Sequence, residues 1–237
     1  MGHLQRKIRT GAFRWTNCLL ALAGAGSLWA QGVPPGATSY WSANNTAVDS
    51  ISGNNGTLVN GAAYAPGKVS QAFSLNGSSS YVQVGGSTQI TGARTYSAWV
   101  YPQAGSLSMP VLAGGAAGGA DFLSISGSRL FVDHWGSSSY ISSLPVTPGS
   151  WNHVAVTYDG AWAIQFYVNG VAARAIPGSL YNYSVSTVEI GGNTYGGTTT
   201  GPSFNGLIDE VYVYPRVLAA SEVQALANPA PGPSIPA

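Results

Sequence analysis

The chain has 237 residues, of which 45% are hydrophobic and only 7% are charged, so a core large enough to exclude global disorder is available. The formal net charge is +1, but four of the nine basic residues lie in the first fourteen positions and all eight acids lie downstream. Without residues 1–30 the chain has five basic and eight acidic residues, a net charge of −3. This balance argues against nucleic acid binding, which needs clustered Lys and Arg side chains.

The N-terminal segment has the three-part pattern of a secretory signal. Basic residues up to Arg14 precede a short apolar run, and a polar, proline-rich stretch follows it. We predict a signal peptide over residues 1–30, cleaved after Ala30 or alternatively after Ala25; an uncleaved anchor is the other interpretation, although the run is short for a membrane span. The mature chain is then secreted, extracellular or periplasmic. Its only cysteine, Cys18, is lost with the signal, which excludes disulfides and zinc–thiolate sites.

After a lead-in over residues 31–38, short runs rich in Val, Ile, Tyr, Trp and Thr alternate with Gly, Asn, Ser and Pro about every ten residues. This rhythm is typical of an all-β sandwich or barrel. The clearest predicted strands are Tyr81–Val84, Arg94–Tyr101, Asp121–Ile125, Leu130–Asp133, Trp151–Tyr158, Ile164–Val168 and Phe204–Tyr214. Ala219–Ala227 is the one segment with a helical pattern. We predict one domain over residues 39–228 and a Pro-rich tail over 229–237.

Hydrolysis of a sugar polymer usually needs two facing carboxylates, which on one strand means acids two residues apart. The acids are Asp49, Asp121, Asp133, Asp159, Glu189, Asp209, Glu210 and Glu222, and no two of them have that spacing. The chain also lacks a Gly-x-Ser-x-Gly elbow and a His-Glu-x-x-His motif. We therefore predict that the protein is not an enzyme, although acids distant in sequence could still converge.

Asp209 lies in an otherwise apolar row, because alternation along the strand places it on one face with Leu207, Val211 and Val213. A buried carboxylate must be neutralised or hydrogen-bonded. Arg216, hydrogen bonds from loop amides and a calcium ion all stay open as partners.

Aromatic side chains in polar loops are candidate ligand contacts, because exposed rings can stack on sugars. We predict Trp135, His134, Tyr140 and Tyr195 as ligand-binding residues. His153, inside a predicted strand, is interpreted as structural.

Five segments resemble those of one family, in the same order. They are Asp49–Leu58, Gly67–Gly77, Tyr96–Val100, Trp151–Tyr158 with Phe166–Gly170, and Phe204–Val211 with Leu218 and Ser221–Val223. Residues 39–227 thus resemble the laminin G-like jelly-roll domains of the concanavalin A-like lectin/glucanase superfamily. The resemblance implies a two-sheet antiparallel jelly-roll sandwich with one short C-terminal helix.

The same resemblance implies a structural calcium ion, as in some relatives, held by Asp209 with backbone oxygens near Tyr40, Trp41, Asn76 and Gly77. It does not carry over glucanase activity, because the family's acid triplet is absent here. We therefore expect a secreted, non-catalytic module that binds a glycan or a glycosylated surface. A structural or adhesion domain that binds protein, and an atypical glycoside hydrolase or lyase, are the alternatives.

Overall fold

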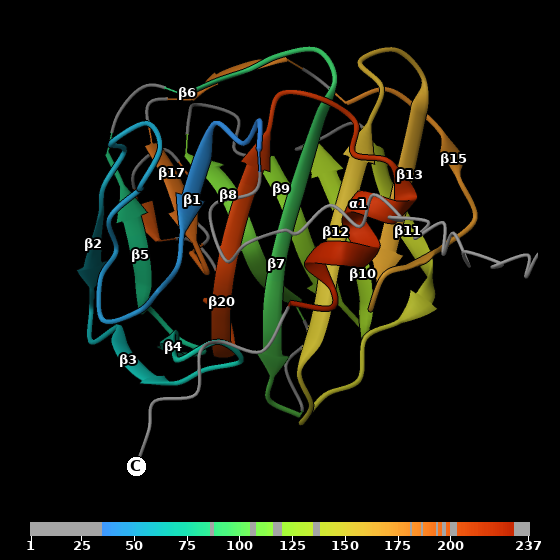
Figure 1. The fold of residues 1–237 in the computed structure, drawn as a ribbon. Coiled ribbons are helices and arrows are strands. Elements are labelled where there is room, and N and C mark those ends of the chain that lie inside the picture. Colours follow the sequence, from blue (N-terminus) through green and yellow to red (C-terminus); the bar gives the residue numbers. More distant parts are fainter. Residues whose placement is uncertain are drawn as a thin grey trace, which may run out of the picture. The chain divides into compact units, whose positions relative to one another are not determined.

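The computed structural model describes residues 35–229, apart from 86–87, 105–107, 116–119, 135–137, 181, 186, 193, 196–197 and 200–202. The predicted signal peptide and almost all of the Pro-rich tail lie outside this range. In the described part, two antiparallel sheets face each other and one short helix follows the last strand, which confirms the predicted jelly-roll sandwich (Figure 1). No helix within the described residues is long and apolar enough to cross a membrane.

The larger sheet has nine strands in the described part of the chain. They are β1 (Ser39–Trp41), β3 (Ala63–Pro66), β4 (Gln71–Asn76), β7 (Arg94–Pro102), β12 (Asn152–Tyr158), β13 (Ala163–Val168), β14 (Val171–Ala172), β15 (Ile176–Pro177) and β20 (Asn205–Tyr214). The order is β14-β13-β12-β7-β20-β4-β3, with β1 paired to β20 and β15 to β13. The central strands thus come from distant parts of the sequence, and β20 pairs with β7 across about a hundred residues.

The smaller sheet has seven strands among the described residues. They are β2 (Gly56–Val59), β5 (Tyr81–Val84), β8 (Ser108–Gly115), β9 (Ala120–Ser126), β10 (Arg129–His134), β11 (Ser138–Pro145) and β17 (Thr187–Ile190). The order is β11-β10-β9-β8-β17-β5-β2. Two short ribbons complete the fold: β6 (Thr88–Ile90) with β16 (Tyr183–Val185), and β18 (Thr194–Tyr195) with β19 (Thr198–Thr199).

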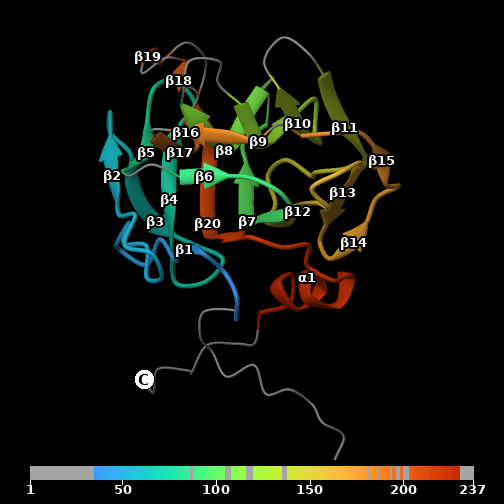
Figure 2. The same cartoon turned by 90° about the horizontal axis from the view of Figure 1, so that it is seen from above.

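The hydrophobic core lies between the two sheets. Tyr96, Ala98 and Val100 of β7 contribute to it at alternate positions, as do Val188 and Ile190 of β17. Alternate residues of a strand point to opposite faces, so Ser97, Trp99 and Glu189 lie on the outer faces of their sheets. The helix α1 (Ala220–Leu226) lies on the outer side of the nine-stranded sheet, and the β18–β19 ribbon lies on the outer side of the other (Figure 2).

A bulge in β20 changes which residues share a face. Glu210 has a positive φ of 50°, and the pairing with β7 shifts register between Asp209 and Tyr212. Ile208 and Val211 consequently both reach the core. The prediction that Asp209 shares a face with Val211 and Val213 is therefore wrong: the inserted residue reverses the alternation and leaves Asp209 on the outer face, opposite Trp99.

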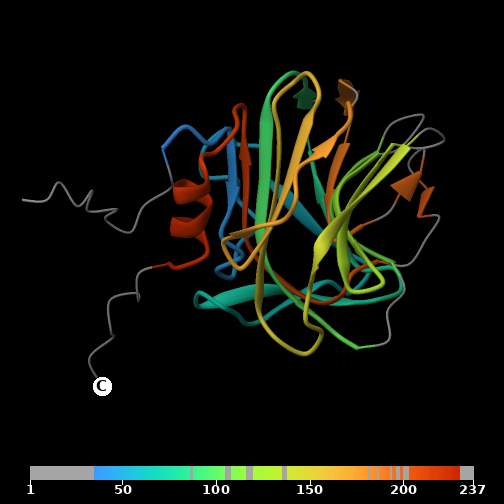
Figure 3. The same cartoon turned by 90° about the vertical axis from the view of Figure 1, so that its right-hand side faces the viewer.

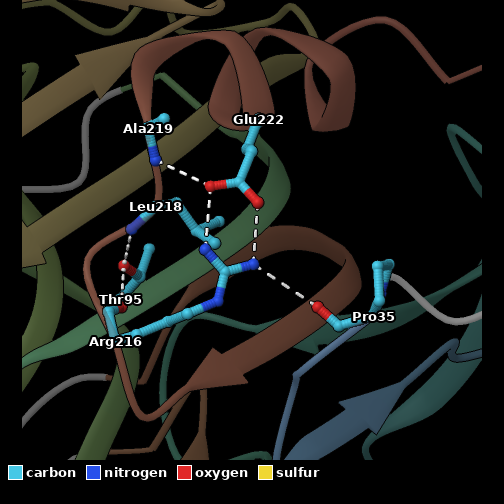
Figure 4. Close-up of polar contacts among 6 residues, drawn as sticks. All are labelled: Pro35, Thr95, Arg216, Leu218, Ala219 and Glu222. Atoms are coloured by element: carbon cyan, nitrogen blue, oxygen red, sulfur yellow. Dashed lines mark hydrogen bonds and ion pairs between the residues drawn. The ribbon is translucent and has the colours of Figure 1, made fainter. Parts of the chain in front are cut away.

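Polar contacts of Arg216, Glu222 and Thr95 fix the connection from β20 to α1. Arg216 contacts the Glu222 carboxylate through both terminal nitrogens, at 2.8 and 2.7 Å, and Glu222 also accepts the N–H of Ala219 at 2.8 Å (Figure 4). The Thr95 hydroxyl donates to the Arg216 carbonyl and accepts the N–H of Leu218. Figure 3 shows α1 outside the two sheet layers. Val223 of this helix packs with Tyr212 and other buried residues.

Candidate functional site

The first loop is organised by one carboxylate. Asp49 is buried, and its Oδ1 accepts the backbone N–H groups of Tyr40 and Ile51, both at 3.0 Å. Its Oδ2 accepts the Ser52 hydroxyl proton. Burial would raise the pKa of Asp49, but the hydroxyl and amide donors outweigh it and hold that pKa below its usual range. Asp49 therefore stabilises the loop in which it lies.

Asp209 lies beneath the turn that connects β3 to β4. Its Oδ2 accepts the N–H of Val69 at 2.8 Å, and the backbone N–H groups of Glu210 and Lys68 also stabilise the ionised carboxylate. The turn comes this close because residue 67 is glycine: a Cβ there would lie 2.7 Å from Oδ2. Oδ1 has no hydrogen-bond partner among the described residues, and burial raises the pKa of Asp209 to about 7.

Calcium binding at Asp209, which the family resemblance implies, stays a prediction. The N–H of Val69 occupies one oxygen of this carboxylate, Oδ1 has no hydrogen-bond partner among the described residues, and the Lys68 ammonium lies 4.4 Å from the centroid of the Trp99 ring. The described residues hold no cluster of three or more His, Cys, Asp or Glu side chains suited to a metal.

The other residues predicted to hold calcium lie on or beside strands that pair with β20. Asn76 pairs with Asn205, four residues before Asp209 on β20, and its side chain accepts the N–H groups of residues 78–80. Gly77 donates its N–H to the Phe204 carbonyl. Tyr40 pairs with Tyr212, and Trp41 pairs with Val211. Calcium held by Asp209 with these backbone oxygens stays a prediction.

Glu210, at the bulge, is held by two stacked tyrosines. The hydroxyl of Tyr40 donates to both carboxylate oxygens at 2.9 Å, and that of Tyr212 donates to Oε2 at 2.6 Å. The two rings stack with centroids 4.4 Å apart. Burial raises the pKa of Glu210, and the hydroxyl donors oppose the rise.

A buried serine–histidine pair lies on the same outer face. Ser97 Oγ and His153 Nε2 are 2.8 Å apart, and both side chains are 1% exposed. Burial lowers the pKa of His153 to about 3, so the ring is neutral. Nδ1 has no partner among the described residues, so no acid orients the ring as in a hydrolase triad. The pair supports the structural interpretation of His153.

The predicted ligand residues fall in different places. Trp135 lies outside the described residues. His134 ends β10, where it pairs with Ser138 of β11, and Tyr195 belongs to β18. Tyr140 lies on the edge strand β11; its ring is partly buried against the core and covers Gly178, where a Cβ would collide with the ring. Tyr140 thus closes one edge of the sandwich.

Trp162 is an exposed aromatic residue that the sequence analysis did not single out. It lies in the turn between β12 and β13, and 64% of it is exposed. Its carbonyl accepts the N–H of Gly178 at 2.9 Å, so Trp162 and Tyr140 both contact Gly178. The Asp159-Gly160 pair two residues upstream of Trp162 was the available signal, because such turns project onto the surface.

The sequence matches a known protein family whose description agrees with the architecture above. Residues 76–224 match the model of the family described as the concanavalin A-like lectin/glucanases superfamily. The chain belongs to this superfamily. None of the curated proteins compared with it matches.

Several solved structures of this superfamily's fold are similar to the chain. Domain 4 of AbnA, a GH43 extracellular arabinanase from Geobacillus stearothermophilus solved with arabinotriose, is 25% identical, with a TM-score of 0.64 over 81% of this chain and 98% of that one. The binding domain of botulinum neurotoxin serotype G (18% identity, TM-score 0.61) and a Trypanosoma rangeli sialidase (16%, 0.61) each match 81% of this chain. The chain spans 50% of the former and 32% of the latter, and these two share its fold.

Proposed function

We propose that the protein is a secreted, non-catalytic module that binds carbohydrate. The observation that supports this most directly is the likeness to domain 4 of the arabinanase, whose structure contains arabinotriose and which is covered over 98% of its length. The likeness therefore extends to a whole domain of that enzyme.

The carboxylates of the described residues support the non-catalytic part of the proposal. Asp49 and Asp209 accept backbone N–H groups, Glu210 accepts tyrosine hydroxyls, and Glu222 pairs with Arg216. Asp159 accepts three N–H groups of its own turn. A general acid and base would need to face a substrate, and these five acids face their own chain instead.

Affinity electrophoresis and calorimetric titration would test the proposal. We expect the purified chain 31–237 to be retarded by one or more soluble polysaccharides, arabinan first, and to bind arabinotriose without releasing reducing sugar. Absence of binding across arabinan, xylan, β-glucan, mannan and sialylated glycans would refute the proposal.

A glycoside hydrolase or lyase is the second candidate function, because the register of the smaller sheet places two acidic residues on either side of one residue of β8. Glu189 of β17 and Asp121 of β9 are both paired with Ala113 of β8. β17 and β9 are separated by twice the spacing between paired strands, about 10 Å. In inverting glycosidases the two catalytic carboxyl groups lie about 6.5–9.5 Å apart. Against it, Glu189 is only 2% exposed. Release of reducing sugar that is lost in Glu189→Gln would favour this candidate over the binding module.

A further inference from the structure

The turn between β12 and β13 presents its tryptophan in a fixed position. Asp159 Oδ1 accepts the N–H groups of Ala161, Trp162 and Ala163 at 2.9, 2.8 and 2.9 Å. The Tyr158 hydroxyl donates to the Ala161 carbonyl at 3.1 Å, and Gly178 donates to the Trp162 carbonyl. The backbone that carries the indole is thus ordered before any ligand arrives, which lowers the entropic cost of binding.

Trp162 is the only aromatic residue among the large hydrophobic residues that are exposed in the described part of the chain. The others are Val48, Ile51, Ile141, Val171 and Val217. Exposing an indole to water is unfavourable, yet the turn holds this one at the surface at 64% exposure. An indole combines an apolar face with an N–H donor, and such rings are suited to binding sites that are partly wet.

We propose that the Trp162 indole is a stacking platform for a neutral sugar ring, an inference that rests on the carbohydrate-binding function proposed above. The C–H groups of a pyranose or furanose face the ring, and hydroxyl groups at the sugar edge face the polar atoms of the turn. The Asp159 carboxylate is the nearest charged group of that turn and accepts hydroxyl protons through Oδ2.

Charge at the turn selects the class of sugar. The backbone N–H groups of Ala163 and Ala161 hold the pKa of Asp159 below its usual range, so the carboxylate stays ionised at neutral pH. An anion beside the platform repels a sialic or uronic acid, and it accepts hydrogen bonds from a neutral pentose or hexose. Neutral oligosaccharides are therefore the expected ligands.

Gly178 connects the platform to the edge of the sandwich. It bonds to Trp162 through its N–H, and the Tyr140 ring lies against its Cα. Because residue 178 has no side chain, the Tyr140 ring packs directly on this backbone. Tyr140, one of the residues predicted from sequence, is therefore the second aromatic group near the turn that carries Trp162.

Calorimetric titration with arabinotriose and affinity electrophoresis in arabinan test the platform. We expect Trp162→Ala to weaken binding about tenfold or more, which is about 1.4 kcal/mol, and Trp162→Phe to retain most of it. Val171→Ala is the matched control, because Val171 is 58% exposed on β14 and outside the turn. Urea unfolding of each variant shows that the fold is intact, since an exposed side chain contributes little to stability.

The outcomes separate the two proposals. If the wild-type chain binds and Trp162→Ala binds equally well, the platform is refuted while carbohydrate binding stands. If Trp162→Ala and Val171→Ala lose affinity equally, the effect is not specific to the indole and the platform is also refuted. If the wild-type chain binds none of the saccharides tested, both proposals fail. Tighter binding of a sialylated glycan than of arabinotriose would overturn the preference for neutral sugars.

Discussion

Asp49 and Asp209 are both buried, but their pKa values are shifted in opposite directions. Asp49 has its hydroxyl and amide donors close around it, which hold its pKa below the usual range despite burial. Asp209 has fewer donors and one oxygen without a partner in the described part, so burial dominates and raises its pKa to about 7. The balance between burial, the neighbouring Glu210 charge and the donors that reach the carboxylate therefore sets the direction of each shift.

The first prediction concerns Asp209→Asn. An unfolded aspartate titrates near pH 3.9, whereas native Asp209 titrates near 7. Between these values the native state binds more protons, so the Asp209 contribution to the free energy of unfolding falls as the pH rises from about 4 to about 7. An amide does not ionise, and we expect the variant to gain stability relative to wild type over that range, by about 4 kcal/mol.

Urea denaturation of both proteins at pH 4.5 and pH 8 measures this difference. His153 acts in the opposite sense, because burial lowers its pKa to about 3 and its contribution rises with pH between about 3 and 6.5. That contribution is common to both proteins and cancels when they are compared. Parallel pH profiles would show that Asp209 does not titrate in this range.

At the scale of elements, α1 is positioned by contacts at its N-terminal end. The helix has only seven residues, too few to be stable alone, and Val223 is its one buried residue. The Glu222 carboxylate both accepts the Ala219 N–H and pairs with Arg216, which also bonds to the Pro35 carbonyl at 3.4 Å (Figure 4). One side chain thus links the helix to the last strand and, through Arg216, to the segment that enters β1.

The second prediction is that Glu222→Ala lowers the free energy of unfolding by about 1 kcal/mol, most of it from the lost acceptor at the helix start. The ion pair itself contributes little, because its side chains are 40% and 30% exposed. Glu222→Gln keeps an acceptor for the Ala219 N–H and loses the charge, so its cost should be smaller. Equal losses in the two variants, measured by urea denaturation, would assign the effect to the ion pair instead.

At the scale of the molecule, packing rather than disulfide bonds holds the two sheets of the sandwich together. The chain's one cysteine precedes the described residues, while the core between the sheets draws side chains from every part of the domain. A domain of about 200 residues buries enough apolar surface to fold without disulfides.

The third prediction follows from this single core. Chain 31–237 should unfold in one cooperative thermal transition, with calorimetric and van't Hoff enthalpies in agreement. The midpoint should be the same with and without a thiol reductant. Two resolved transitions, or a midpoint shifted by reductant, would contradict a single core that is independent of disulfides.

Local patterns determined which segments form strands and where the helix lies. Alternating apolar residues marked β7, β12, β13 and β20, and the Asn169-Gly170 turn marked the β13–β14 hairpin, because side-chain period and turn chemistry depend on neighbouring residues alone. Local patterns also suggested Tyr140 as a ligand contact, which stays a prediction.

Only the tertiary structure decided how distant segments meet. The bulge at Glu210, which turns Asp209 to the outer face, is set by pairing with β7, and the donor to Asp209 comes from a turn 140 residues earlier. The backbone of Trp162 is likewise held in part by the N–H of Gly178, which lies outside its own turn. Such features arise from non-local pairing, which no periodicity within one strand can specify.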